Sequence, residues 1–405
     1  MDKLSRYKQI LVILKCDLIA SASTLLTKQF ITVNPAHIMA KYEIKDGVAI
    51  IPEGIEMIED YAFLHCKELK RVVIPQWVRR IGDEAFYGCK NLEVVELPEW
   101  LEDIGEQAFK GCSSLKELTL PRCVKRIEEC AFRGCSSLQN LSIPSSMTHI
   151  GGGAFSDCSS LVRIKVDSNN PVYDNREDCN AIIHTESNTL IRGCSNTIIP
   201  PSVTSIEYRA FSDCTSLTQI SLPPSVTSIG GDAFHCCKSL THISIPPSVT
   251  SIGACAFWGC TSITQISIPP SVTSIGGWAF SGCTSLTQIS IPPSVTSIED
   301  NTFRCCKSLT QISLPPSVTS IENHAFYGCA SLTQISLPPS VTSIGWSAFY
   351  GCTSLTQISI SPSVTSIGKE AFCRCTSLTL VKVSKNTELA ENAFEDCPNV
   401  KIERY

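Results

Sequence analysis

The sequence predicts a repeat solenoid, a parallel β-solenoid of about 15 coils of 23 residues joined by short 3-10 or helical turns. Phenylalanine recurs in register, a cysteine follows each of these fourteen phenylalanines by three residues, and the repeats carry similar short apolar runs around one or two prolines. A solenoid lengthens without dividing into globules. The 405 residues therefore need not form several domains.

The phenylalanine register defines the repeat. Fourteen of the fifteen phenylalanines are spaced by 23 residues within two blocks and by 22 at the last step, and only Phe30 lies outside the series. The series is Phe63, Phe86, Phe109, Phe132 and Phe155, then Phe211, Phe234, Phe257, Phe280, Phe303, Phe326, Phe349, Phe372 and Phe394.

The cysteines follow the same period. Fourteen of the 23 lie three residues after a repeat phenylalanine, from Cys66 to Cys397. A disulfide framework usually has irregular spacing in a short secreted chain. Here the cysteines occupy one position, or slot, of the repeat. This regularity instead indicates a row of buried free thiols, which favours a reducing compartment.

One unit, residues 286–308, shows how a coil is built. Leu286, Ile289 and Ile291 have the alternation of a short strand, and the following Pro-Pro pair ends its ladder. Val295 and Ile298 indicate a second short extended piece. The glycine that usually follows, as at Gly276 and Gly345, is interpreted as permitting a tight turn. The Ala-Phe-x-x-Cys stretch then predicts a helical or 3-10 turn that places phenylalanine in the core. A single unit cannot cover its own apolar side, so neighbouring coils must do so.

The register breaks for 56 residues between Phe155 and Phe211. Turn-forming clusters alternate there with the apolar runs 181–183 and 190–191, which predicts a β-hairpin within one modified coil. The chain is divided accordingly into an N-terminal helical capping segment (1–41), charged N-terminal repeats (42–166), a hairpin-containing variant coil (167–197), near-identical repeats (198–383) and a C-terminal capping repeat (384–405).

Residues 1–41 lack the repeat. Basic residues precede an apolar run at 10–14, and Ala20-Ser21-Ala22 resembles a signal-peptide cleavage site. Lys15 and Asp17 interrupt the apolar stretch, which is too short to span a bilayer. Leucines and a tyrosine recur at helical spacing, so we expect a helix that caps the solenoid, with a signal peptide as the alternative.

The repeat unit resembles the BspA-type (TpLRR) leucine-rich repeat. The resemblance is carried by the strand motif 309–315, by the Ser-Val-Thr-Ser-Ile of 317–321 and by the Ala-Phe-x-x-Cys of 325–329, and it covers residues 42–405. The interrupted coil also resembles a hairpin variant of that family. The resemblance implies a right-handed parallel leucine-rich-repeat solenoid and a surface or secreted binding protein that acts in adhesion.

Charge and motifs exclude several functions. With a net charge of −5 the chain has no basic face, so nucleic acid is not an expected partner. The seven histidines fall at unrelated phases, and no zinc-protease, phosphate-loop or nucleophile-elbow motif is present. We therefore expect no enzyme activity and no cofactor. The extra cysteines, among them Cys236 and Cys305, lack paired zinc-ligand spacing, so no metal site is predicted.

Two exposed surfaces are candidate binding sites. The first is a polar row between the inward-facing strand residues, flanked by a parallel serine row from Ser221 to Ser359: Gln219, His242, Gln265, Gln288, Gln311, Gln334 and Gln357. The second is an aromatic edge beside the Ala-Phe turn, where the copies otherwise vary: Trp258, Trp278, Tyr327, Trp346 and Tyr350. Tryptophan and tyrosine are enriched at binding hot spots. Alternatively, the polar row only keeps the sheet soluble and the aromatic residues fold onto their own coil edges.

These observations predict a non-catalytic scaffold that binds a protein or glycan through its extended surface. The main alternative is a cell-surface adhesin or structural array in which repeat length matters more than any site. A minor alternative is ice binding by threonine rows such as Thr273, Thr296, Thr319 and Thr342. No transmembrane segment is expected. The thiol row and the poor signal region favour the cytoplasm, whereas the family resemblance favours the cell surface.

Overall fold

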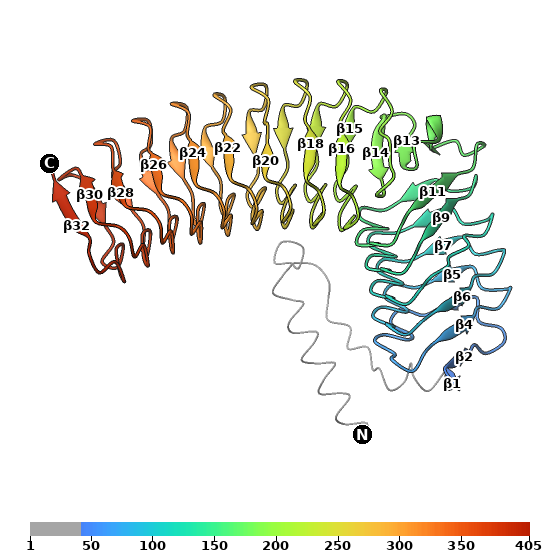
Figure 1. The fold of residues 1–405 in the computed structure, drawn as a ribbon. Coiled ribbons are helices and arrows are strands. Elements are labelled where there is room, and N and C mark those ends of the chain that lie inside the picture. Colours follow the sequence, from blue (N-terminus) through green and yellow to red (C-terminus); the bar gives the residue numbers. More distant parts are fainter. Residues whose placement is uncertain (1–41) are drawn as a thin grey trace, which may run out of the picture. The chain divides into compact units, whose positions relative to one another are not determined.

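The computed structural model describes residues 42–405, which belong to one compact unit (Figure 1). The helix expected within residues 1–41 lies outside the described residues. The described chain is a parallel β-solenoid of about 16 turns of about 23 residues with almost no helix. Coils follow one another in sequence order (Figure 1), and most of them contribute two short strands and one compact turn.

The first strand of the coils has two to four residues, and in all of these strands except the last at least one hydrophobic residue is buried. In Gln288–Ser290 and its copies the pattern is exposed, buried, exposed, as the alternation predicts. These strands are β2 (Val48–Ile50), β4 (Arg71–Val73), β6 (Val94–Glu96), β9 (Asn140–Ile143), β11 (Arg163–Val166), β16 (Gln219–Ser221), β18 (His242–Ser244), β20 (Gln265–Ile266), β22 (Gln288–Ser290), β24 (Gln311–Ser313), β26 (Gln334–Ser336), β28 (Gln357–Ser359), β30 (Leu380–Val383) and β32 (Lys401–Arg404).

The second strand of most coils is a dipeptide that follows the proline turn. These strands are β3 (Met57–Ile58), β5 (Arg80–Ile81), β7 (Asp103–Ile104), β8 (Arg126–Ile127), β10 (His149–Ile150), β15 (Ser205–Ile206), β17 (Ser228–Ile229), β19 (Ser251–Ile252), β21 (Ser274–Ile275), β23 (Ser297–Ile298), β25 (Ser320–Ile321), β27 (Ser343–Ile344), β29 (Ser366–Ile367) and β31 (Glu388–Leu389). Both series pair in parallel with a 23-residue register, such as Gln288 with Gln311 and Ser297 with Ser320. At the N-terminal end, β1 (Glu43–Lys45) pairs antiparallel with β2.

The repeat phenylalanines form the centre of the core. Twelve of them are almost fully buried, and neighbouring rings stack with centroids 4.9–5.7 Å apart and nearly parallel planes. This spacing matches the distance between adjacent coils, so each ring is covered by the rings before and after it. The predicted burial of phenylalanine by coil stacking is confirmed.

The cysteine row is buried, as predicted, and it also bonds the coils together. All fourteen thiols of the row are buried, and the cysteines of residues 42–405 are free thiols. The Sγ of Cys283 donates to the carbonyl oxygen of Phe257 in the preceding coil at 3.2 Å, and the same bond recurs from Cys89 to Cys397. Burial raises the pKa of the Cys283 thiol to about 12, so the thiol stays protonated and remains a donor.

The Ala-Phe turn has 3-10-type bonds but does not extend as a helix. In one coil the amides of Ser281 and Cys283 donate to the carbonyls three residues earlier, at 3.0 and 3.1 Å. Left-handed backbone at Trp278 (φ 61°) and Gly282 (φ 71°), two residues either side of Phe280, interrupts each turn. The amides of these turns donate instead to the next coil, as from Phe280 N to Thr302 O at 2.9 Å.

The glycine before this turn has a different role from the one predicted. Gly276 and Gly345 do not have positive φ, so they do not supply the tight turn. A Cβ at Gly276 would lie 2.4 Å from the backbone nitrogen of Ala254, and one at Gly345 would lie 2.7 Å from that of Asn323. These glycines therefore allow the backbones of successive coils to approach closely.

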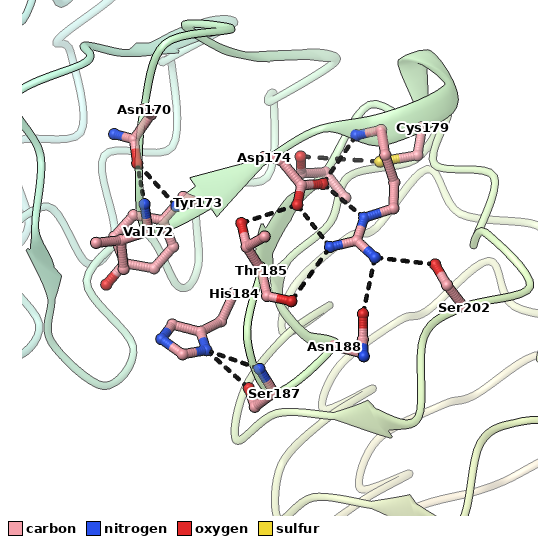
Figure 2. A network of polar contacts seen from close by, with 12 residues as sticks. Asn170, Val172, Tyr173, Asp174, Cys179, His184, Thr185, Ser187, Asn188 and Ser202 are labelled. Atoms are coloured by element: carbon pink, nitrogen blue, oxygen red, sulfur yellow. Dashed lines mark hydrogen bonds and ion pairs between the residues drawn. The ribbon is translucent and has the colours of Figure 1, made fainter.

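The interrupted coil contains an antiparallel meander. Strand β13 (Ile182–His184) pairs antiparallel with β12 (Tyr173–Asp174) and with β14 (Thr189–Arg192), and β14 then pairs in parallel with β15. A single 3-10 turn, η1 (Arg176–Asp178), precedes β13. The Arg176 guanidinium holds the meander together by binding the Asp174 carboxylate at 2.6 and 2.8 Å and Asn188 Oδ1 at 2.7 Å (Figure 2).

Glycine replaces phenylalanine in this coil. The N–H of Gly193 donates to Ala210 O at 2.9 Å, which is the bond that the phenylalanine N–H makes in regular coils, as from Phe211 to Ala233. A Cβ at Gly193 would lie 2.2 Å from Cε1 of Phe211, so the Phe211 ring packs directly against the Gly193 backbone. The aromatic stack therefore stops at Phe155 and starts again at Phe211.

Side chains replace the backbone partners that the meander removes. The Tyr173 hydroxyl accepts the N–H of Ile150 at 2.9 Å, and the Asn180 amide accepts the N–H of Ile164 at 2.6 Å. The buried Arg192 guanidinium, which is 3% exposed, donates to the carbonyls of Arg209 and Ser212, both at 3.2 Å. An unpaired buried carbonyl costs about 1–3 kcal/mol, so these substitutions keep the variant coil in the stack.

Candidate binding surfaces

The predicted polar row lies on the exposed side of the first strands. Gln219 and His242 are register partners, as are Gln265 with Gln288 and Gln311 with Gln334, and all seven residues of the row are exposed. A shallow groove follows the later part of this face from Gln265 to Lys382, and its floor is formed by the strand residues between the glutamines and serines.

The polar side chains of this row are not bonded to one another. Among residues 42–405, no hydrogen bond joins one side chain of the glutamine row to another or to the serine row. The neighbouring threonines differ, since Thr287 Oγ1 donates to Thr264 O of the preceding coil at 3.1 Å. Each glutamine amide thus offers two donors and one acceptor oxygen to a molecule lying along the solenoid.

The predicted aromatic residues pack on one another and on basic side chains. Tyr327 and Tyr350 stack at 4.7 Å with an interplanar angle of 3°. The Arg304 guanidinium lies over the rings of Tyr327 and Trp278, at 4.5 and 5.7 Å, in cation–π geometry. Trp258 is covered differently, by stacking on His235 at 4.5 Å.

Two of these aromatic residues remain accessible. Trp278 is 37% exposed and Trp346 is 49% exposed, whereas Trp258, Tyr327 and Tyr350 are half-buried. Contacts between coils thus link Trp278, Tyr327 and Tyr350, partly through Arg304, whereas Trp258 packs on His235 and Trp346 on His324. Sequence reasoning missed Arg304 because its contribution depends on aromatic side chains in the coils on either side of it.

Three of the four threonines of the predicted row use their hydroxyls in hydrogen bonds to the preceding coil. Thr273 Oγ1 donates to Thr250 O at 3.2 Å, and Thr319 and Thr342 repeat the bond to their own preceding coils. Their hydroxyl protons point along the solenoid, which weakens the case for an ice-ordering threonine surface.

The first-strand face of the N-terminal coils carries a second, less polar groove that the sequence did not indicate. Val73, Val94 and Trp100 are 43%, 42% and 53% exposed and line this groove together with charged residues. The Arg79 guanidinium lies 5.4 Å from the centre of the Trp100 ring. Sequence reasoning missed this surface because valine at an outward strand position looks like one more apolar strand residue.

A polar seam crosses the turn side of the solenoid where the phenylalanine is missing. Asp157 bonds Arg133 at 2.7 Å and accepts the Ser212 hydroxyl at 2.8 Å, although Ser212 lies 55 residues further along the chain. Burial opposes ionisation, but the Arg133 charge and these hydrogen bonds hold the pKa of the Asp157 carboxyl at about 2.

The seam continues into a group of three potential ligands, Asp213, His235 and Cys236, whose ligand atoms all lie within 4.8 Å of one another. The Asp213 carboxylate is 3.5 Å from Nδ1 of His235. Burial disfavours the charged imidazole, but hydrogen bonds with Asp213 and Cys236 outweigh it and raise the pKa of His235 to about 9. Sequence reasoning overlooked this group because it compared cysteines three coils apart and not neighbouring slots of adjacent coils.

One serine–histidine contact resembles part of a catalytic arrangement. His184 Nδ1 lies 2.8 Å from Ser187 Oγ (Figure 2), but the same nitrogen also accepts the Ser187 N–H at 3.3 Å. The contact closes an exposed hairpin turn, and within residues 42–405 no carboxylate bonds the His184 ring. It has the character of a turn contact.

No curated protein matches the chain. Several solved structures are similar to the chain. One is a leucine-rich repeat protein from Bacteroides ovatus (27% identity, TM-score 0.57), with 90% of this chain and 97% of that chain covered. Another is a leucine-rich repeat protein from Eubacterium ventriosum (26% identity, TM-score 0.64), with 80% of this chain and 81% of that chain covered. The chain is also similar in fold to the pneumococcal vaccine antigen PcpA (20% identity, TM-score 0.60), with 89% of this chain and 80% of that chain covered.

Among residues 42–405, no helix has the length and apolarity that crossing a membrane requires. The sequence profile of the BspA-type leucine-rich repeat region matches residues 56–176, 191–307 and 275–401, which together include most of the coils. The chain therefore belongs to the BspA-type leucine-rich repeat family.

Proposed function

We propose that this protein is a non-catalytic scaffold that binds an extended protein or glycan along the first-strand face of coils 265–382. The observation that supports the proposal most is the row of exposed glutamine side chains with unused amide groups along a continuous groove. Repeating amides and hydroxyls suit a ligand that is itself extended and polar, such as a peptide backbone or a glycan chain.

The proposal is tested with a variant that removes three neighbouring amides. Binding of the chain to a glycan array and to an array of extended peptides is compared with that of the Gln288→Ala, Gln311→Ala, Gln334→Ala triple variant. At about 1 kcal/mol for each hydrogen bond, the triple variant should weaken its best ligand by roughly 100-fold. Unchanged affinity would reject the glutamine face as the binding surface.

The aromatic edge is the second candidate surface, and the exposed Trp278 and Trp346 support it. The matched variant replaces Trp258, Trp278 and Trp346 by alanine. Loss of binding in this variant, with binding retained by the glutamine variant, would move the binding site to the edge.

A structural or adhesive array is the alternative that the near-identity of the coils favours. In that case removal of one complete 23-residue coil, residues 286–308, should reduce adhesion in proportion to length. Neither triple variant should then have an effect.

A further inference from the structure

We propose that Asp213, His235 and Cys236 form a binding site for a zinc-class divalent cation. The three residues come from two neighbouring coils at the polar seam. Asp213 and Cys236 occupy the same slot, two residues after Phe211 and Phe234, and His235 directly precedes Cys236. The parallel stacking of coils therefore brings together ligands that are 23 residues apart.

The backbone fixes the two ligands that share a slot. Asp213 (φ 53°) and Cys236 (φ 53°) both have left-handed backbone, in a slot that other coils often fill with glycine. The Asp213 amide donates to His235 O, and the Cys236 amide donates to Trp258 O, each at 2.7 Å. These bonds fix the positions from which the carboxylate and the thiol project.

The imidazole is also held in place. The His235 ring stacks on the Trp258 indole at 4.5 Å with an interplanar angle of 13°, and its Nδ1 lies 3.5 Å from the Asp213 carboxylate. Tetrahedral zinc with bonds of about 2.0–2.3 Å places its ligand atoms roughly 3.4–3.8 Å apart. The histidine–aspartate distance already meets this condition, and the thiol is within 4.8 Å of both ligands.

The next coil leaves space beside the sulfur. Gly259 occupies the slot that follows Asp213 and Cys236, and a Cβ there would lie 3.1 Å from the Cys236 Sγ. A larger residue at this slot would crowd the thiol, whereas glycine leaves it accessible. Three protein ligands then leave a fourth coordination position for water or for a group of a bound molecule.

The nearby cations Arg133 and Arg209 are paired with Asp157 and Asp232, at 2.7 and 3.7 Å. The partner of the Asp213 carboxylate is therefore His235, and a metal ion that binds here takes the place of the imidazole proton. The combination of thiolate, imidazole and carboxylate selects zinc or its spectroscopic substitute cobalt over magnesium and calcium, which prefer oxygen ligands alone.

The chain contains a matched control site. Cys305 occupies the same slot three coils further on, with left-handed backbone (φ 56°) and a glycine, Gly328, in the next coil. Its preceding residue is Arg304, however, and the slot before it is Gly282, so neither the histidine nor the aspartate is present. Cys305 thus has the geometry of Cys236 without its companion ligands.

The test titrates the reduced full-length chain with Co²⁺ and then displaces it with Zn²⁺. One cobalt ion per chain should bind with a thiolate-to-metal charge-transfer band. Cys236→Ala should abolish the band, and His235→Asn and Asp213→Asn should each weaken binding by about 100-fold or more, while Cys305→Ala leaves it unchanged. No thiolate band at saturating cobalt, or a band that survives Cys236→Ala, would overturn the proposal.

A second measurement needs no variant and therefore does not depend on variant folding. In the wild-type chain, Zn²⁺ should protect Cys236 from alkylation at least tenfold while Cys305 stays reactive, as read by peptide mass spectrometry. Equal protection of both cysteines, or protection of neither, would contradict a site built from Asp213, His235 and Cys236.

Discussion

Replacement of Gly193 by alanine tests how the variant coil fits into the stack. The added Cβ would lie 2.2 Å from Cε1 and 2.5 Å from Cζ of Phe211, well inside van der Waals contact. Phe211 cannot easily yield, because it is fully buried and stacks on Phe234 at 5.1 Å. Alanine must therefore displace either the ring or the backbone of the meander.

The expected cost follows from these contacts. Overpacking of a well-packed core costs about 1–3 kcal/mol. Gly193 does not have positive φ, so alanine can adopt its backbone conformation. Such a replacement stabilises the folded protein by about 0.4–1 kcal/mol, because alanine restricts the unfolded chain more than glycine does. The net expectation for Gly193→Ala is a loss of about 1 kcal/mol in the free energy of unfolding.

Urea unfolding followed by circular dichroism measures this loss against Gly152→Ala. Gly152 is in the coil before the meander, also lacks positive φ, and has no atom within 4 Å of a Cβ. Gly152→Ala should be neutral or slightly stabilising. Adding Phe211→Leu to Gly193→Ala should recover about 1 kcal/mol relative to the sum of the single variants. Equal stability of the two alanine variants would refute the proposed packing.

Three further predictions use the same unfolding measurement. Phe280→Ala, which removes a ring stacked on both sides, should cost about 3–5 kcal/mol, whereas Phe394→Ala at the end of the stack should cost less than half of that. Asp157→Asn should lose about 2 kcal/mol at pH 7; because the folded pKa of about 2 is below the unfolded value, the difference from wild type should persist above pH 4 and disappear as the pH falls towards 2. Arg192→Met, which removes the guanidinium donor of the Ser212 carbonyl while the Arg209 carbonyl keeps the Ser212 N–H, should lose about 1–3 kcal/mol, and a neutral result would contradict the capping role of the guanidinium.

The coil architecture could be predicted from sequence because its signals are local and repeated. Each regular coil contains the Phe, the Cys and an Ile or Leu that ends the second strand at nearly fixed offsets, and the Phe and Cys are buried in every regular coil before the last. A pattern repeated in register leaves little ambiguity about which residues face inward.

The predicted roles failed where contacts between coils decide the outcome. The repeat predicts a turn role for Gly276, but the glycine is needed because the backbone of Ala254 in the preceding coil lies too close for a side chain, and a single repeat does not reveal this contact. The grouping of Asp213 with His235 and Cys236 likewise becomes visible only when adjacent coils are aligned slot by slot. Arg192 was overlooked because a buried arginine in a hairpin has no counterpart in the repeat.

The central claim is that the apolar side of each coil is covered only by the coils before and after it, and thiol accessibility tests it directly. Under pulsed alkylation of the folded chain, the partly exposed Cys123 and Cys305 should react quickly. Row cysteines such as Cys283, buried and with a pKa near 12, should react only as fast as the solenoid unfolds. Labelling of Cys283 at the rate of Cys305 would contradict the stacked-coil account.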